Sequence, residues 1–419
     1  MSPVYNKIIL DNGLKIIAHR MPRMQSLSLG IWIKAGGRYE NSANKGAAHF
    51  LEHLLFKGTK KYPTALDLAA AVDSVGADFN AFTDKEYTGF YVKAASRHLE
   101  LALDVLSEMI WRPKLEEKEV EKEKGVIVEE MNMRNDHPMM KVEEDFETLL
   151  YGQTALGREV IGSKETVLGI KKNDFLDFRK HWYQPENMVL GVVGGIKNKK
   201  TIEKYFGLQN KDKRTIVHHN TFRLQQERIK VIYKKTEQAH FCLGVPTFER
   251  THKDRYVLDL LAVILGGNMS SRLFSEVRER RGLAYYIRTS PTDFFDTGYL
   301  VSQAGTDINK SVEAIKIIQS EYYKISGDKS LRLEKDLKKA KEFIKGKLAL
   351  SLEDSKTIAL LFSEDLLLEN KTRTPEDILS EIEKVSVADL KRVAKIIFQP
   401  AKLRLAIIGP YKKSLLFKI

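Results

Sequence analysis

Hydrophobic and polar residues alternate along residues 1–95 in the manner of β-strands. Two short apolar runs flank an Asp-Asn-Gly turn at residues 11–13, and residues 26–36 carry leucine or isoleucine at every second position from 27 to 33. Residues 78–94 alternate in the same way. A period of two is typical of strands with one buried face, and Asn-Gly favours a tight turn. The pattern predicts a hairpin, a third strand and a later strand pair.

Helical periodicity separates and follows these strands. A helix is expected over residues 44–56, because Asn41 or Ser42 can cap its start and Gly58 follows its end. Further elements are expected in the first half: helices over 63–75, 98–111 and 116–134, and a buried strand over 187–195. Strands paired by hairpins and grouped with helices predict an α+β fold, in which a mainly antiparallel sheet packs against α-helices on one face.

The second half of the chain repeats this plan. The strand-like segment that ends at Gly194 resembles the one that ends at Gly409, an offset of 215 residues. The helical segment containing Glu108 resembles the one containing Glu321, an offset of 213 residues. An offset near half the chain length indicates a duplication.

The chain length agrees with two cores, since 419 residues exceed the usual size of one domain. We therefore expect two homologous domains, a catalytic domain over 1–210 and a second domain over 211–419. The highly charged segment 197–220 between them is expected to be a linker.

Composition excludes a disordered chain, because 43% of the residues are hydrophobic and only 11 are prolines. There are 69 lysines and arginines against 56 acidic residues, a net charge of +13. Both signs are mixed along most of the chain, which is typical of a solvated surface. Most of the basic segments lack the interleaved aromatic residues that stack on bases, so no nucleic-acid partner is expected.

Cysteine content and apolar runs indicate the compartment. The single Cys242 cannot form an internal disulfide, which favours a reducing environment. The first residues lack the basic and apolar regions of an export signal. The longest apolar stretch, residues 256–265, contains Asp259 and is far shorter than the roughly 20 residues of a spanning helix. We expect a soluble, cytoplasmic protein that does not bind membranes.

Two histidines and a glutamate in the first predicted helix could form a metal site. His49 and His53 are four residues apart and therefore lie on one helix face, and Glu52 borders that face. Two neutral imidazoles at this spacing can bind one zinc ion, with a carboxylate beside the open coordination position. The alternative is a core-facing histidine pair with a surface glutamate.

A catalytic zinc usually has a third protein ligand, and the helix expected over 116–134 offers carboxylates. Glu123 and Glu130 are seven residues apart and share one face, next to the apolar run 126–128 that indicates burial. Buried carboxylates need a cation or hydrogen-bond donors. Glu129 is a competing candidate, and the alternative for all three is an exposed acidic face.

These segments resemble the inverted zincins, the superfamily of pitrilysin, insulin-degrading enzyme and the mitochondrial processing peptidases. Residues 46–59, GAAHFLEHLLFKGT, are similar to the family's zinc signature almost throughout, and Glu130 follows His53 at the family's spacing. Residues 80–92 resemble the segment after that signature. Residues 265–286, LGGNMSSRLFSEVRERRGLAYY, resemble its second signature. The resemblance covers nearly the whole chain.

The resemblance implies a zinc-dependent peptidase with one Zn²⁺ per chain. It implies a role for each matching residue: His49, His53 and Glu130 as metal ligands, Glu52 as the general base, Glu123 as an acidic residue supporting the ligands, Asn80, Ala81 and Phe82 on an edge strand that binds the substrate main chain, and Arg278 and Tyr285 as a substrate-clamping pair.

The resemblance also implies an assembly. Two-domain chains of this size are similar to the short branch of the family, in which two subunits enclose a chamber. Because both signatures occur on this chain, we expect a homodimer that hydrolyses peptides or unfolded segments. The alternatives are a non-proteolytic core subunit of the same fold and a mitochondrial-type presequence processing subunit.

Overall fold

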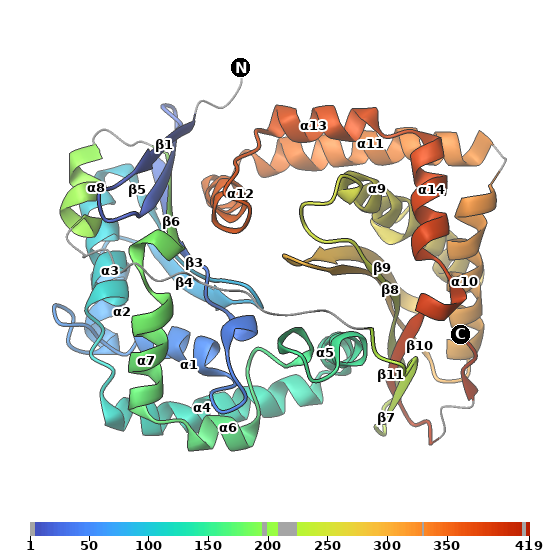
Figure 1. The fold of residues 1–419 in the computed structure, drawn as a ribbon, viewed down its shortest axis with the longest axis horizontal. Helices are drawn as coiled ribbons and strands as arrows, with labels where there is room; N and C mark the ends of the chain where they lie inside the picture. The colour runs from blue at the N-terminus through green and yellow to red at the C-terminus, as the bar shows by residue number, and fades with distance from the viewer. Residues whose placement is uncertain (1–4, 195–198, 208–223, 329–330, 413–415) are drawn as a thin grey trace. The chain divides into compact units, whose positions relative to one another are not determined.

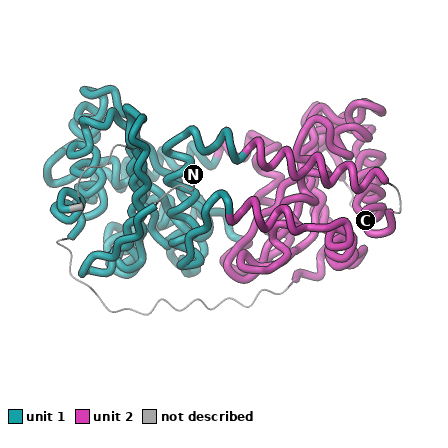
Figure 2. The backbone as a smooth tube through the Cα atoms, turned by 90° about the horizontal axis from the view of Figure 1, so that it is seen from above, with its two compact units in different colours: residues 1–131, 158–219, 348–376 teal, residues 132–157, 220–347, 377–419 magenta. Residues whose placement is uncertain are grey.

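The computed structural model describes residues 5–194, 199–207, 224–328, 331–412 and 416–419 (Figure 1). The chain forms two compact units, and each unit is built from three separate stretches of sequence (Figure 2). Unit 1 consists of residues 1–131, 158–219 and 348–376, and unit 2 consists of residues 132–157, 220–347 and 377–419. The predicted domain boundary at 210/211 lies outside the described residues and remains a prediction.

Unit 1 contains a six-stranded sheet in the order β1-β2-β6-β3-β5-β4. Its strands are β1 (Tyr5–Ile9), β2 (Lys15–Arg20), β3 (Ser26–Ile33), β4 (Asp78–Thr83), β5 (Thr88–Ala95) and β6 (Met188–Gly194). Neighbouring strands are antiparallel, except that β2 and β6 are parallel. The predicted hairpin, third strand and strand pair are all present, and β4 lies at an edge of the sheet.

Helices cover one face of this sheet because the alternating side chains of β3 point toward them. Leu27, Leu29, Ile31 and Ile33 join one apolar core with residues from α1 (Ala47–Leu55), α3 (Leu99–Trp111) and α7 (Lys172–Trp182). The other helices of unit 1 on the chain's first half are α2 (Ala65–Asp73), α6 (Lys164–Gly169), α8 (Lys199–Phe206) and most of α4 (Glu117–Asp136). The four helices predicted for this half are confirmed within a few residues at each end.

Unit 2 contains a five-stranded sheet in the order β7-β11-β8-β10-β9. Its strands are β7 (Ile229–Tyr233), β8 (Gln238–Thr247), β9 (Ala284–Asp293), β10 (Gly298–Asp307) and β11 (Arg404–Gly409). Apart from the parallel pair β7 and β11, neighbouring strands are antiparallel. Helices of this unit are α5 (Pro138–Tyr151), α9 (Arg255–Gly266), α10 (Ser311–Gly327), α14 (Val387–Ile397) and most of α11 (Leu331–Ser351) and α13 (Pro375–Lys384).

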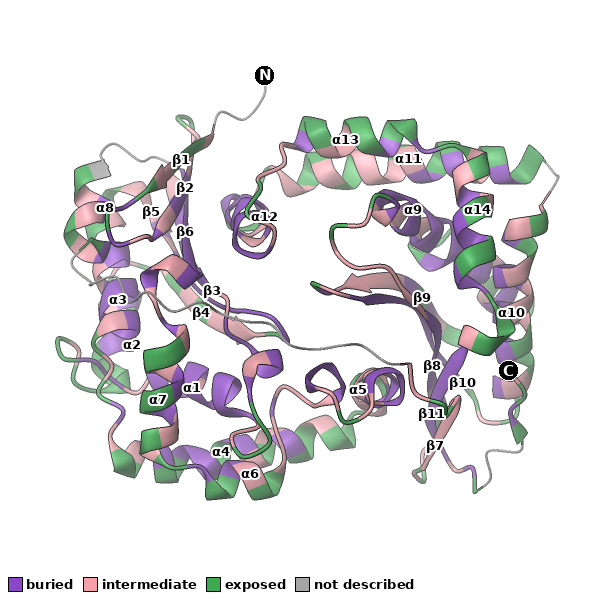
Figure 3. Cartoon of the chain, in the orientation of Figure 1, coloured by how far each residue is buried: buried purple, intermediate pink, exposed green. Residues whose placement is uncertain are grey.

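The two sheets repeat one plan, which confirms the predicted α+β class and duplication. Strand β6, ending at Gly194, and strand β11, ending at Gly409, each lie between a parallel and an antiparallel neighbour. Unit 1 has β1 as an additional edge strand. Figure 3 shows that inner strands such as β3, β6, β8 and β10 are largely buried, while α11 and α13 carry exposed residues.

Each sheet also has a helix on its second face, which the prediction of helices on one face did not include. In unit 1 this helix is α12 (Ser355–Leu368), whose Phe362 packs in a separate cluster with Trp32 and Val189. In unit 2 it is α5, whose Phe146 packs against Tyr299. The sequence supplies α12 from its second half and α5 from its first half. The two halves of the chain therefore exchange a helix.

The expected linker is partly helical. Residues 199–206 form α8, and Ile202 and Phe206 are buried in the core of unit 1. The charged run contains two apolar residues four positions apart. These residues give the helix a buried side. Residues 197, 198 and 208–220 of the expected linker lie outside the described residues. No helix among the described residues is long and apolar enough to cross a membrane.

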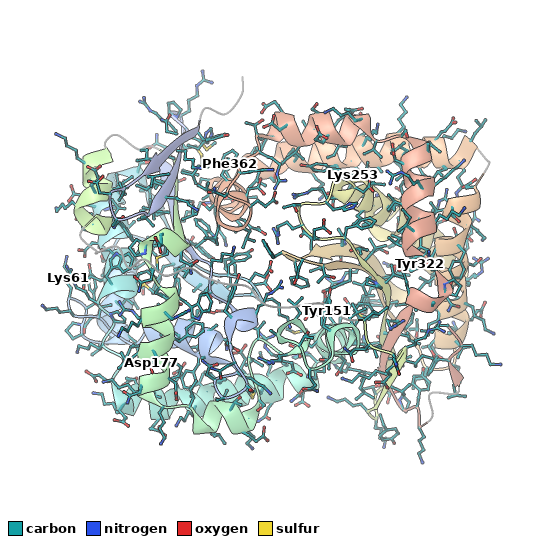
Figure 4. All side chains as sticks on the ribbon, in the orientation of Figure 1. Lys61, Tyr151, Asp177, Lys253, Tyr322 and Phe362 are labelled. Atoms are coloured by element: carbon teal, nitrogen blue, oxygen red, sulfur yellow. The ribbon has the colours of Figure 1, made fainter. Side chains whose placement is uncertain are left out.

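The contribution of α12 to the stability of unit 1 can be tested by substituting Phe362, which is labelled in Figure 4 and is 1% exposed. Phe362→Ala should lower the free energy of unfolding by about 3–5 kcal/mol, because it leaves a cavity between α12 and the sheet. All three tryptophans, Trp32, Trp111 and Trp182, belong to unit 1, so tryptophan fluorescence during urea unfolding reports on this unit.

The matched control is Leu66→Ala on α2, a residue that is 77% exposed, with an expected change below about 0.5 kcal/mol. A change for Phe362→Ala as small as that of the control would show that α12 does not stabilise unit 1.

Candidate metal and active site

Helix α1 carries the predicted histidine pair and begins at a constrained position. The residue before the helix, the N-cap Gly46, has φ of 89°, and a Cβ there would lie 2.6 Å from the Ile161 carbonyl oxygen, so only glycine fits. The buried Glu40 carboxylate accepts hydrogen bonds from the Gly46 and Ala48 amides, both at 2.8 Å. These bonds satisfy amides that the first helical turn leaves without partners. Burial raises the pKa of Glu40 to about 8 although the two amide bonds oppose this shift.

One face of α1 presents His49, Glu52 and His53. The two imidazole rings lie 4.7 Å apart between centroids. The side chain of His49 is 9% exposed and that of His53 is 22% exposed, so both are largely removed from solvent. The other residues of α1 are buried in the core of unit 1. Apolar packing therefore fixes the direction in which this polar face points.

Helix α4 adds Glu130 to the histidine pair. Glu130 Oε2 lies 3.6 Å from His49 Nε2 and 3.6 Å from His53 Nε2. One ligand atom from each of the three residues falls within 4.8 Å of the others, and no second group of this kind occurs among the described residues. Ligands about 2.0–2.1 Å from a tetrahedral zinc ion would be about 3.3 Å apart. The observed spacing therefore fits a zinc ion after a small contraction.

Glu123, seven residues before Glu130 on α4, contacts the other ring nitrogen of His53. Its Oε1 lies 2.9 Å from His53 Nδ1, and its Oε2 lies 2.6 Å from Lys57 Nζ. Burial alone would raise the pKa of Glu123, but the His53 hydrogen bond and the Lys57 charge outweigh burial and keep this pKa below its usual value. An ionised Glu123 fixes the His53 tautomer with its proton on Nδ1, which leaves Nε2 as the donor atom for a metal.

Burial distinguishes the neighbouring glutamates on α4. Glu129 is exposed, while Glu123 is buried and Glu130 is partly buried. The expectation that the run 126–128 is buried was wrong for Val126, which is 47% exposed. Only Ile127 of this run enters the core, so the apolar run does not mark the buried face of the helix.

Glu52 is enclosed by groups from other elements. Its Oε2 accepts a hydrogen bond of 2.6 Å from Thr83 Oγ1, at the end of β4. Tyr183, which is buried, lies close enough that the negative charge of Glu52 adds to the effect of burial and raises the tyrosine pKa above its usual range. A carboxylate on the same helix face as two imidazoles could accept a proton from a group bound beside them.

Comparisons with known proteins identify the family of this chain. The family profile described as Insulinase (Peptidase family M16) matches residues 15–164, and that of the Peptidase M16 inactive domain matches residues 169–342. The chain belongs to the M16 peptidase family. The predicted inverted-zincin resemblance is thereby confirmed, and the M16 profile of the first part spans the whole cluster from His49 to Glu130.

Related M16 proteins match over almost their full length. The protein named uncharacterized zinc protease YmxG from Bacillus subtilis is 35% identical over 403 residues, covering 96% of this chain and 97% of the relative. The uncharacterized zinc protease SCO5738 from Streptomyces coelicolor is 34% identical, covering 96% and 89%. The crystal structure of a protease from Helicobacter pylori superposes with a TM-score of 0.91 at 25% identity, covering 98% of this chain and 100% of that one.

The predicted peptide-binding residues lie on β4. Asn80 is exposed, and its Oδ1 accepts a hydrogen bond of 2.8 Å from the Ala81 amide. Strand β4 pairs only with β5, so its other side is a sheet edge among the described residues. The ring of Phe82 packs edge-on against Tyr87 at 5.6 Å in the cluster beneath α12. The main chain of Phe82, rather than its ring, is therefore available along this edge.

The predicted clamp residues lie in the second M16 segment, within unit 2. Arg278 belongs to a π-helical turn, Phe274–Glu279, and Tyr285 is the second residue of β9. The Arg278 guanidinium carbon lies 4.7 Å from the Phe274 ring centre and 6.0 Å from the Tyr285 ring centre. Gly282, with φ of 57°, makes the turn between them. The pair thus forms one local cluster, in which Tyr285 is 74% exposed.

Three residues of the site were not identified from the sequence. Lys57 neutralises Glu123, Thr83 donates to Glu52, and Glu40 caps α1. Lys57 and Thr83 both lie in segments with a strong family resemblance, which was the available signal. Glu40 carried no signal, because its link to α1 depends on a loop that folds back.

The role of Glu123 predicts an effect on metal affinity. Glu123→Gln should weaken Zn²⁺ binding about 10- to 100-fold, because the amide cannot hold His53 as strongly or balance Lys57. Competition with a chromophoric chelator measures this affinity. Glu121→Gln, whose native side chain is 60% exposed on the same helix, is the control and should bind zinc like the unmodified protein. Equal affinities for the two variants would contradict the role of Glu123.

Proposed function

We propose that this chain is a zinc-dependent endopeptidase that binds one Zn²⁺ through His49, His53 and Glu130. The observation that carries the proposal is that Glu130 Oε2 lies 3.6 Å from the Nε2 atoms of both His49 and His53, with Glu52 on the same face of α1 as the two histidines. The chemistry of the donors supports zinc, because two imidazoles and one carboxylate are a frequent ligand set of catalytic zinc. The M16 relatives named as zinc proteases support the same reading.

The proposed reaction is hydrolysis of a peptide bond with Glu52 as the general base. A zinc ion held at this site would make a water molecule more acidic and would polarise the peptide carbonyl. Glu52 takes one proton from the attacking water, whose oxygen bonds to the carbonyl carbon. Glu52 then passes this proton to the leaving nitrogen as the C–N bond breaks. The second proton of the water stays on the new carboxyl group until it passes to the amine or to solvent, so the products are one peptide with a new carboxyl group and one with a new amino group.

Substrates of this reaction are extended peptides or unfolded segments. Strand addition to the β4 edge at Asn80, Ala81 and Phe82 requires a substrate main chain that is free to pair as a strand. A folded protein presents few such segments, so folded proteins should resist cleavage. Main-chain pairing also places little demand on side chains, which favours a broad substrate range.

The proposed assembly is a cytoplasmic homodimer whose subunits enclose a chamber. Arg278 and Tyr285 are the proposed clamp on the substrate carbonyl, since a guanidinium and a phenol can donate to the oxygen where negative charge develops. In this proposal the pair of one subunit serves the metal site of the other. A dimer would then carry two complete sites.

The ligand and base assignments predict different outcomes for two variants. Glu52→Gln should keep its zinc and lose at least about 100-fold in kcat, because a general base contributes about 10²–10⁴-fold. His53→Ala should lose both zinc and activity. Metal analysis and cleavage of an unbiased peptide pool, with and without chelator, measure both properties. Stoichiometric zinc in His53→Ala would contradict the ligand set, and full activity of Glu52→Gln would contradict the base.

If Arg278 and Tyr285 of one subunit act at the metal site of the other, two inactive variants should complement each other. Mixing Glu52→Gln subunits with Arg278→Ala/Tyr285→Phe subunits should restore cleavage in the heterodimer, because one of its two sites is then intact. Differently tagged subunits allow the heterodimer to be isolated. An inactive heterodimer whose co-assembly is verified would show that the pair acts within its own chain.

A further inference from the structure

The hydroxyl of Thr83 makes a short contact with the carboxylate that we propose as the base. Thr83 Oγ1 donates to Glu52 Oε2 at 2.6 Å. Glu52 must be ionised to act as a base, and an ionised carboxylate only accepts hydrogen bonds, so in the active form the hydroxyl proton points at Glu52. Hydrogen bonds to charged groups are short and stronger than those between neutral groups. This bond therefore restricts the rotation of the Glu52 carboxylate.

The position of Thr83 is itself fixed by the hairpin that β4 and β5 form. Thr83 pairs with Thr88 across the hairpin, and the Thr88 hydroxyl donates to the Ala35 carbonyl at 2.6 Å. The turn closes with a hydrogen bond of 2.9 Å from the Asp84 amide to the Tyr87 carbonyl. Thr83 is therefore held by main-chain pairing on a rigid element rather than by a mobile loop.

The same turn is anchored to the loop that follows β3. The Asp84 carbonyl accepts a hydrogen bond of 3.2 Å from the Gly37 amide. A Cβ on Gly36 would lie 2.2 Å from that carbonyl, so the two chains pass too closely for a side chain. Arg38 and Glu86 form a buried ion pair of 2.6 Å beside this crossing. The end of β4 thus has little freedom to move away from α1.

Strand geometry connects Thr83 to the peptide-binding edge. Side chains alternate along β4, so Thr83 and Ala81 face the core that contains α1, while Asn80 and Phe82 face the opposite side. Thr83 follows Asn80 by three residues, which is about 10 Å along a strand. One strand therefore carries both the proposed peptide-binding main chain and the hydroxyl that holds Glu52.

We propose that Thr83 is a positioning residue that aligns the Glu52 carboxylate with a peptide bound along β4. It donates to one carboxylate oxygen and thereby sets the direction in which Glu52 takes the proton of the attacking water. Because β4 both holds the base through Thr83 and binds the peptide, the distance from Glu52 to the peptide position is set before the substrate binds. This inference rests on the proposed peptidase function, and it assigns to Thr83 a role in turnover rather than in metal or peptide binding.

The test compares Thr83→Val, which keeps the branched shape without the hydroxyl, with Thr83→Ser, which keeps the hydroxyl. In zinc-loaded full-length protein, cleavage of an internally quenched peptide should show a kcat at least about 10-fold lower for Thr83→Val, the loss expected for a hydrogen bond to a charged group. KM and zinc content should stay as in the unmodified protein. Thr83→Ser should keep a kcat within about 3-fold of it.

A matched control removes a buried threonine hydroxyl elsewhere. Thr289 in unit 2 is 5% exposed and its hydroxyl pairs with Ser302 at 2.6 Å, so Thr289→Val should leave kcat unchanged. Crystal structures of Thr83→Val and the unmodified protein provide a readout that does not depend on activity. We expect the Glu52 carboxylate to change its rotamer, or to lose a single defined rotamer, in the variant.

Several results would overturn the role of Thr83. These are an unchanged kcat in Thr83→Val, an equal loss in Thr83→Ser, or the same Glu52 rotamer with and without the hydroxyl. If the unmodified zinc-loaded protein cleaves no peptide, the proposed function itself fails and this inference fails with it. The two failures are distinguishable, because the first occurs only in the variants and the second occurs in the parent protein.

Discussion

The burial of helix α1 is the constraint on which the rest of the site depends. Eight of its nine residues are buried, His53 being the exception, and the apolar ones lock the helix into the core of unit 1. Its polar residues must then find partners in a restricted set of directions, because a buried polar group without a partner is costly. The partners come from a preceding loop through Glu40, from β4 through Thr83, and from α4 through Glu123 and Glu130.

Charge balance explains why these partners are of different kinds. Glu123 is ionised between His53 and Lys57, which compensates a buried carboxylate without a metal. Glu130 faces the two Nε2 atoms, where a divalent cation would neutralise it. In the proposed site, one carboxylate would therefore orient a histidine ligand and the other would bind the metal. Spacing on α4 makes both possible, because two turns bring Glu123 and Glu130 to the same face.

The exchanged helices make each unit depend on both halves of the chain. Without α12, residues such as Trp32, Val189 and Val193 on the second face of the unit 1 sheet would be exposed to solvent. A fragment that ends near residue 210 would therefore lack part of the support of the strands that hold β4. The sequence repeat therefore divides the chain into two consecutive halves, whereas each compact unit contains residues from both halves.

The sequence predicted the local features and missed the long-range ones. Period-two and period-four patterns identified the strands of unit 1 and α1, because those patterns come from one buried face within a short segment. Helix α12 was missed because its burial depends on Trp32, more than 300 positions away in the sequence. Likewise, the contact of Thr83 with Glu52 joins a strand and a helix that share no sequence pattern. From the residues alone the expected third ligand stayed open among the glutamates of the helix expected over 116–134, and only the family resemblance favoured Glu130.

Anomalous X-ray scattering at the zinc edge would test the central claim most directly. Crystals of the protein grown with one equivalent of Zn²⁺ should show a single anomalous peak per chain, about 2.0–2.2 Å from His49 Nε2, His53 Nε2 and a Glu130 oxygen. A map with no peak among these three residues, or with the zinc bound elsewhere, would contradict the account.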